Sequence, residues 1–416
     1  MAEQHEKALV PQIRFAGFTD PWEQRKLEDY VVVSTAKNVD GRFNKEDVLS
    51  VSGEYGIVNQ IAFQGRSFAG SSVLNYGIVN TGDIVYTKSP LNSNPYGIIK
   101  VNKGIPGIVS TLYAVYRPQD NVHTNFIQVY FEQHERMNNY MHPLVNKGAK
   151  NDMKVTAENA LKGVVTFPSR EEQVIISEFF DRLDSLITLH QRKYDKLCVL
   201  KKTMLDKMFP KGGSLYPEIR FAGFTDPWEQ RKLEDYVVVS TAKNVDGRFN
   251  KEDVLSVSGE YGIVNQIAFQ GRSFAGSSVL NYGIVNTGDI VYTKSPLNSN
   301  PYGIIKVNKG IPGIVSTLYA VYRPQDNVHT NFIQVYFEQH ERMNNYMHPL
   351  VNKGAKNDMK VTAENALKGV VTFPSREEQV IISEFFDRLD SLITLHQRKL
   401  ELLRNIKKSM LDKMFV

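Results

Sequence analysis

Apolar positions follow a helical rhythm over 169–209. They occupy Ile176, Phe179, Leu183, Leu186, Leu197, Leu200 and Met204, and with the polar residues His190 and Lys193 in the middle they keep alternating intervals of three and four residues without a glycine or proline. Ser169 and Glu172 have the Ser-x-x-Glu spacing of a capping box. The pattern predicts one helix of about 60 Å at 1.5 Å per residue, and 375–416 largely repeats it. Pairing of the two helices would cover both apolar seams, whereas a buried core helix is the alternative.

The part before this helix, 13–168, has the shorter apolar runs of strands. We expect strands at 30–34, 48–52, 76–80, 83–87 and 108–116. A helix is expected to begin at Thr19, because Pro21 and Glu23 suit its first turn. A second helix is expected over 124–140. The fold class is therefore α+β, with mixed α/β domains joined to long helices.

The chain is an internal repeat, because 13–193 recurs without a single change as 219–399. Only the ends of the two long helices differ. The predicted organisation has six parts: an N-terminal tail (1–12), a first mixed domain (13–168), a first long helix (169–209), a linker (210–218), a second mixed domain (219–374) and a second long helix (375–416). The linker contains Gly212 and Gly213 between prolines, which cannot continue a helix.

The composition limits the class of protein but does not indicate a function. Fifty basic residues against 45 acidic ones give a net charge of +5, which is compatible with nucleic-acid binding but not diagnostic of it. The single cysteine, Cys198, excludes a disulfide framework. No run of 18 apolar residues and no signal peptide is visible, so we expect a cytoplasmic protein.

Catalytic motifs are missing from the sequence. It has no phosphate-binding Gly-x4-Gly-Lys-Ser/Thr loop, no His-Glu-x-x-His motif and no Asp-Pro-Pro-Tyr-type motif of amino-methyltransferases. The glycine-rich stretches lack the strand–turn–helix context of a dinucleotide site and are expected to be turns. We therefore expect neither catalysis nor a bound cofactor or metal in this chain.

Polar loops supply the candidate binding residues. Lysine, arginine and serine suit phosphate oxygens, and asparagine suits a bidentate contact with adenine. The alternative is that these loops are only solvated surface. The candidates for DNA binding are Arg66, Lys88, Ser89, Asn92, Asn94, Lys100, Lys147, Lys150 and Asn151, with their repeat equivalents Arg272, Lys294, Ser295, Asn298, Asn300, Lys306, Lys353, Lys356 and Asn357.

The helical stretch PSREEQVIISEFFDRLDSLITLHQRKYDKLCVLKKTMLDKMFP, 168–210, resembles the conserved helical region of the DNA-specificity subunit of type I restriction-modification systems. The opening IRFAGFTDPWEQRKL, 13–27, is similar to the entry into a target-recognition domain of that family. The tandem order matches the family over nearly the whole chain. The loop with Gly148, Lys150 and Asn151 also resembles a Gly-x-x-polar loop near the end of many family recognition domains.

The resemblance implies a division of labour. The family subunit reads double-stranded DNA, and its two helices run antiparallel and dock two modification subunits. Those subunits carry S-adenosylmethionine and methylate adenine. Where two restriction subunits join, they supply ATP- and Mg-dependent translocation and cleavage. This chain is then a non-catalytic specificity subunit without a cofactor of its own.

The exact repeat adds an expectation. Identical recognition domains on antiparallel helices should read inverted identical half-sites, which predicts a palindromic bipartite target. The helices would set an unread spacer, with half-sites about one to two helical turns apart, one turn being roughly 34–36 Å. Two alternatives remain: a scaffold of two domains on a coiled-coil strut that does not bind DNA, and an enzyme whose site is built from scattered residues.

Overall fold

A computed structural model describes residues 9–88, 94–147, 153–294, 300–353 and 359–416. The chain divides into two compact units. Unit 1 consists of Met1–Gln191 together with Arg398–Val416, and unit 2 of Arg192–Gln397. Each unit therefore takes its recognition domain from one repeat and the end of a long helix from the other repeat.

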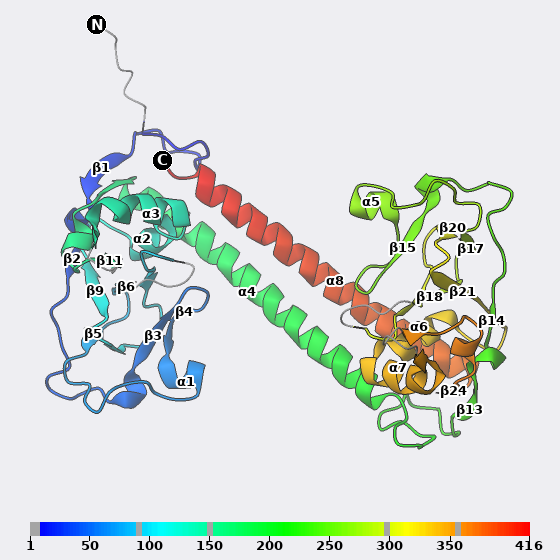
Figure 1. The fold of residues 1–416 in the computed structure, drawn as a ribbon. Coiled ribbons are helices and arrows are strands. Elements are labelled where there is room, and N and C mark those ends of the chain that lie inside the picture. Colours follow the sequence, from blue (N-terminus) through cyan, green and yellow to red (C-terminus); the bar gives the residue numbers. More distant parts are fainter. Residues whose placement is uncertain (1–8, 89–93, 148–152, 295–299, 354–358) are drawn as a thin grey trace, which may run out of the picture. The chain divides into compact units, whose positions relative to one another are not determined.

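Unit 1 is built around a four-stranded antiparallel sheet in the order β2-β9-β6-β7. Figure 1 labels β2, β9 and β6 of this sheet. Its central strands are apolar and buried, because α2 and the helix ends cover one face. The strands are β1 (Glu23–Lys26), β2 (Val31–Val33), β3 (Leu49–Ser52), β4 (Gly56–Asn59), β5 (Gly77–Val79), β6 (Ile84–Thr87), β7 (Ile99–Val101), β8 (Gly107–Val109), β9 (Tyr113–Pro118), β10 (Asn146–Lys147), β11 (Met153–Lys154) and β12 (Val164–Phe167). The helices are α1 (Gln60–Gln64), α2 (Thr124–Tyr130), α3 (His134–Met141) and α4 (Arg170–Lys207).

Unit 2 repeats this arrangement, with the sheet order β14-β21-β18-β19. Its strands are β13 (Glu229–Lys232), β14 (Val237–Val239), β15 (Leu255–Ser258), β16 (Gly262–Asn265), β17 (Gly283–Val285), β18 (Ile290–Thr293), β19 (Ile305–Val307), β20 (Gly313–Val315), β21 (Tyr319–Pro324), β22 (Asn352–Lys353), β23 (Met359–Lys360) and β24 (Val370–Phe373). Its helices are α5 (Gln266–Gln270), α6 (Thr330–Glu338), α7 (His340–Met347) and α8 (Arg376–Lys413).

The strand predictions are confirmed, with one refinement. Each of the first four predicted runs contains one strand, and the run 108–116 forms two strands, β8 and β9, around a turn in which Tyr113 donates its amide to Ser110 O. Sequence reasoning did not find β4, β7, β10 or β11. These are short strands whose partners are needed to stabilise them.

The helix expected at Thr19 is wrong. The residues after Pro21 form β1, which pairs antiparallel with β12 in the register Glu23↔Phe167. Trp22 explains the difference, because its side chain is fully buried and its amide donates to Leu9 O at 2.8 Å. Tertiary packing of this residue overrides the local helix signal.

The helix expected over 124–140 is interrupted. α2 ends at Tyr130, and Gln133 is extended, with φ −75° and ψ 119°, immediately before α3. The interruption lets the carboxylate of Glu132 turn toward a lysine of α8, Lys407, at 2.7 Å. Unit 2 has the same interruption at Gln339, between α6 and α7.

The two long helices run antiparallel, which confirms the predicted pairing. In unit 1 the contacts proceed from Gln191 with Arg404 to Asp184 with Lys407, so residue numbers fall along α4 as they rise along α8. At its start, α4 receives half of the predicted capping box: Ser169 Oγ accepts the amide of Glu172 at 3.4 Å. The Glu172 carboxylate instead holds Arg14 through two hydrogen bonds of 2.8 and 2.7 Å.

The predicted apolar seam is only partly correct. Ile176 and Leu183 are buried, but Leu186 and Leu200 are exposed by 43% and 39%. Near each end of the helix pair, a long helix packs against the recognition domain as well as against the other long helix. Residues outside the predicted seam are therefore buried too. Phe180 is fully buried for this reason, in one hydrophobic cluster with Phe126 of α2 and with Phe415.

The end of each long helix completes the core of the unit that it enters. Phe415, beyond the end of α8, lies 6.0 Å from the Trp22 ring and 5.7 Å from that of Phe126. Arg136 of α3 donates to Leu411 O at 2.9 Å and lies 4.5 Å from the Phe415 ring, so it caps the last turn of the incoming helix. In unit 2 the corresponding anchor is Phe209, whose ring lies 5.9 Å from that of Trp228.

Candidate nucleic-acid interface

The loop that carries Arg66 is held in shape by polar contacts from α1. Asn59 caps α1 by accepting the amide of Ala62 at 3.0 Å. Gln60 then reaches past the helix, and its side-chain oxygen accepts the amide of Phe68 at 2.6 Å. Gly65 ends the helix at φ 74°, a left-handed conformation that favours glycine. The loop therefore presents Arg66 from a defined backbone.

Arg66 lies beside an exposed aromatic side chain, and a second pair of exposed aromatic side chains lies on α1 and on the turn before β4. Its guanidinium is 4.6 Å from the ring of Phe68, and the rings of Tyr55 and Phe63 lie 5.3 Å apart. All three aromatic side chains are about half exposed. We call these four residues the Arg66 surface. Planar cationic and aromatic groups of this kind can contact both the phosphates and the bases of a nucleic acid.

Unit 2 presents the same surface. The guanidinium of Arg272 lies 4.6 Å from the ring of Phe274, and the rings of Tyr261 and Phe269 are 5.4 Å apart. Sequence reasoning selected the two arginines but missed their aromatic neighbours. An apolar residue in a loop is more often read as core, and no sequence signal shows that these rings face solvent.

Lys88 and Lys294 occupy equivalent places at the ends of β6 and β18. Each ammonium donates to a backbone carbonyl 3.0 Å away, that of Thr111 or Thr317. Each lysine is half-buried, so its charge is anchored near the surface. The adjacent turn begins at Asn94, whose carbonyl accepts the amide of Gly97 at 2.9 Å.

Asn94 and its equivalent Asn300 are half-buried rather than fully presented. Gly97 is required at the end of the Asn94 turn. It has φ 77°, and a β-carbon there would lie only 1.9 Å from Thr87 O. The turn is thus fixed tightly against β6 at Thr87.

The prediction that Lys100 and Lys306 carry exposed charges is wrong. Both were selected as exposed phosphate ligands, but they are only 8% and 9% exposed in β7 and β19. Burial lowers the pKa of each ammonium. The Lys100 ammonium is 4.0 Å from Glu132, beside the helix pair. We therefore leave these two lysines out of the proposed interface.

The remaining candidates are not placed by the structure. Lys147 and Lys353 lie in the short strands β10 and β22, where only the backbone is described. The candidates outside the described residues are Ser89, Asn92, Lys150, Asn151, Ser295, Asn298, Lys356 and Asn357.

Among the described residues, no group of three or more histidine, cysteine or acidic side chains is arranged to hold a metal ion. None of the described helices has both the length and the apolar character that crossing a membrane requires.

Comparison with known proteins gives the family. The model of the type I restriction modification DNA specificity domain matches twice, over residues 19–198 and 225–405. The S subunit of a type I restriction-modification system from M. genitalium has the same fold, with a TM-score of 0.58 at 12% identity over 98% of this chain and 99% of that one. The HsdS subunit from Thermoanaerobacter tengcongensis aligns with a TM-score of 0.40 at 15% identity, over 96% and 98% of the two chains. The chain belongs to the type I restriction-modification DNA specificity family and carries two identical DNA-recognition domains.

Proposed function

We propose that this chain reads a palindromic bipartite DNA target, one half-site with each recognition domain. The observation that carries the proposal is the antiparallel pairing of α4 and α8 inside each unit, combined with the exact identity of the two domains. Identical surfaces attached to helices of opposite direction would meet inverted half-sites. The length of the helices between the domains would then set the unread spacer.

We also propose that the helix pair docks two methyltransferase subunits. Leu186 and Leu189 of α4 are exposed by 43% and 46%, and Leu392 and Leu395 of α8 by 44% and 45%. Leucines three residues apart on one helix form a continuous apolar strip, and such strips mark interaction surfaces. The strip is the same in both units, which suits two copies of one partner.

The chemistry would reside on the partners. S-adenosylmethionine would bind the methyltransferase subunits, and ATP with Mg would bind restriction subunits where these join. A methylation assay on target DNA tests this division directly. The chain alone should transfer no methyl groups, and activity should appear when a modification subunit is added. Methyl transfer by the purified chain alone would contradict the proposal.

The Arg66 surface gives a matched prediction. Arg66→Ala and Arg272→Ala are the same change in identical domains, so each should weaken target binding by about 1–3 kcal/mol, through loss of one half-site contact. The two losses of binding free energy should be nearly equal, and the double variant should show both losses together. Duplex-binding titrations at a fixed salt concentration measure this, because phosphate contacts depend on salt.

The control for this prediction uses arginines of the same domains. Arg25→Ala and Arg231→Ala remove exposed arginines that are paired with Glu23 and Glu229 on β1 and β13. They should leave binding within about 0.5 kcal/mol of the parent, as surface changes usually do. If the Arg25 variant weakens binding as much as the Arg66 variant, the Arg66 surface is not the interface.

A further inference from the structure

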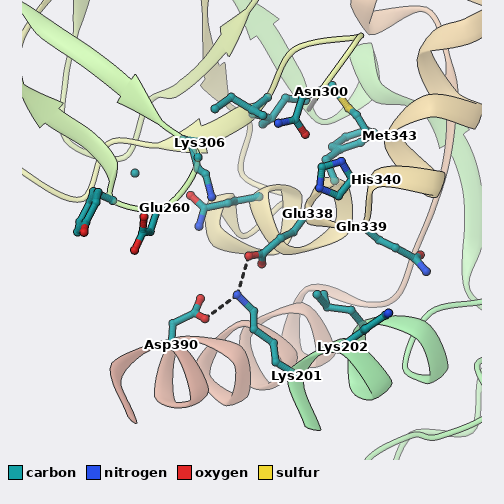
Figure 2. A pocket seen from close by; sticks show the side chains of 18 of the residues that line it. Lys201, Lys202, Glu260, Asn300, Lys306, Glu338, Gln339, His340, Met343 and Asp390 are labelled. Atoms are coloured by element: carbon teal, nitrogen blue, oxygen red, sulfur yellow. Dashed lines mark hydrogen bonds and ion pairs between the residues drawn. The ribbon is translucent and has the colours of Figure 1, made fainter. Parts of the chain in front are cut away.

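A buried cluster of charges joins each recognition domain to both long helices. In unit 1, Lys407 of α8 lies 2.7 Å from Glu132 and 2.6 Å from Asp184 of α4. In unit 2, Lys201 of α4 lies 2.6 Å from Glu338 and 2.5 Å from Asp390 of α8. Figure 2 shows this second cluster from the cavity of about 1090 Å³ that Lys201 and Lys306 line. We call Lys407 and Lys201 the cluster lysines.

Each cluster lysine comes from one repeat and its carboxylates come from the other. Both lysine side chains are only 15% exposed. Burial pulls the pKa of Lys407 down, but the carboxylates of Glu132 and Asp184 outweigh it, so the pKa lies above its ordinary value. The lysine therefore stays charged, and it depends on its two partners for that charge.

The helix ends have diverged around this position. Tyr194 and Cys198 of α4 correspond to Leu400 and Arg404 of α8, whereas Lys201 and Lys407 are the same residue at corresponding positions. Since the recognition domains are identical, each lysine meets the same pair of carboxylates. The cluster lysine is thus retained within three residues of Cys198 and Arg404, where the two helix ends differ.

Charge pairs fix register more strictly than leucine contacts do. If a helix end slipped by one turn, its lysine would move about 5.4 Å along the axis and leave both carboxylates. Exposed leucines at regular spacing could find new neighbours after such a slip, but a buried ammonium could not. The cluster therefore defines which turn of each helix end meets its recognition domain.

We propose that Lys201 and Lys407 are positioning residues that set the length of the unread spacer between the two half-sites. The proposal rests on the bipartite reading proposed above. α4 and α8 each begin in one unit and end in the other, so register at the clusters fixes how many helical residues lie between the recognition domains. One turn of helix is about 5.4 Å, and one base pair rises about 3.4 Å. A slip of one turn thus corresponds to a spacer change of one to two base pairs.

The test uses the full chain, expressed with its modification subunit, on a plasmid library whose spacers vary in length. The parent should methylate one spacer length and discriminate against its neighbours by more than about a hundredfold, the loss expected when buried charges separate. In the double variant Lys201→Met/Lys407→Met, this discrimination should fall to about tenfold or less. The charge-retaining variant Lys201→Arg/Lys407→Arg should restore most of it.

Neighbouring lysines provide the matched control. Lys202 and Lys408 are exposed, one residue along each helix, and Lys202→Met/Lys408→Met should keep the parental spacer. If Lys201→Met/Lys407→Met does not fold, Asp184→Asn/Asp390→Asn tests the same ion pairs by removing one carboxylate charge from each cluster. A folded cluster variant that retains the single parental spacer overturns the inference, since a purely structural role lowers stability without changing spacer choice. A parent chain without any bipartite motif overturns both this inference and the proposed function.

Discussion

Replacement of Phe415 by alanine is expected to destabilise unit 1 by about 3–5 kcal/mol, the usual cost of removing a buried phenylalanine. Phe415 is only 6% exposed and contacts the rings of Trp22, Phe126 and Tyr130. Arg136 would also lose the ring over which its guanidinium lies. The second-last residue of the chain thus supports the domain that begins the chain.

Intrinsic fluorescence can assign this loss to one unit. The chain has two tryptophans, Trp22 in unit 1 and Trp228 in unit 2. In a Trp228→Phe background, urea unfolding followed through Trp22 should shift to lower midpoint with Phe415→Ala and stay unchanged with Phe209→Ala. In a Trp22→Phe background, unfolding followed through Trp228 should shift to lower midpoint with Phe209→Ala and stay unchanged with Phe415→Ala. If Phe209→Ala instead shifts the Trp22 transition, each helix end packs on its own repeat and the described units are wrong.

Removal of the apolar strip should abolish partner docking without unfolding the chain. Leu186→Ser/Leu189→Ser should cost at least about 2 kcal/mol of binding per docking site if these leucines act as hot spots. Since all four leucines are more than 40% exposed, stability should change by less than about 0.5 kcal/mol per residue. Sedimentation of the complex should show one modification subunit lost with the α4 pair. Both modification subunits should be lost when Leu392→Ser/Leu395→Ser is added.

The control for docking is an exposed leucine elsewhere in each repeat. Leu112 and Leu318 are exposed by 63% and 64% in the recognition domains, before β9 and β21. Leu112→Ser/Leu318→Ser should leave the stoichiometry at two. A quadruple helix variant that still binds two modification subunits would show that docking uses another surface.

The long helices and the repeat could be predicted because their signals are local or exact. Helical spacing, the capping serine and identity between repeats need no knowledge of distant contacts. The helix expected at Thr19 failed for the opposite reason, because Trp22 is placed by Phe126 and by Phe415 from the far end of the chain. A local signal cannot report a packing partner that arrives from another repeat.

The candidate interface shows the same difference between local sequence signals and properties that depend on the whole fold. Arg66 could be selected from its glycine-flanked loop, but its aromatic neighbours are recognisable only when their exposure is known. Lys100 shows the converse error, since this lysine between apolar residues of a strand is buried and lies 4.0 Å from Glu132, between α2 and α3. The cluster lysines did carry a sequence signal. They begin a stretch, 201–209 and 407–415, that the two helix ends share except at one position, but this identity alone does not distinguish them from Lys202 and Lys408.

The central claim, that two identical domains read one palindromic target, is tested most directly by the genomic methylation motif. The measurement sequences methylated adenines in cells that express this chain with its modification subunit. We predict one bipartite motif whose two halves are reverse complements, separated by an unread spacer of fixed length. Two unrelated half-sites, or a motif with a single half, would contradict the account.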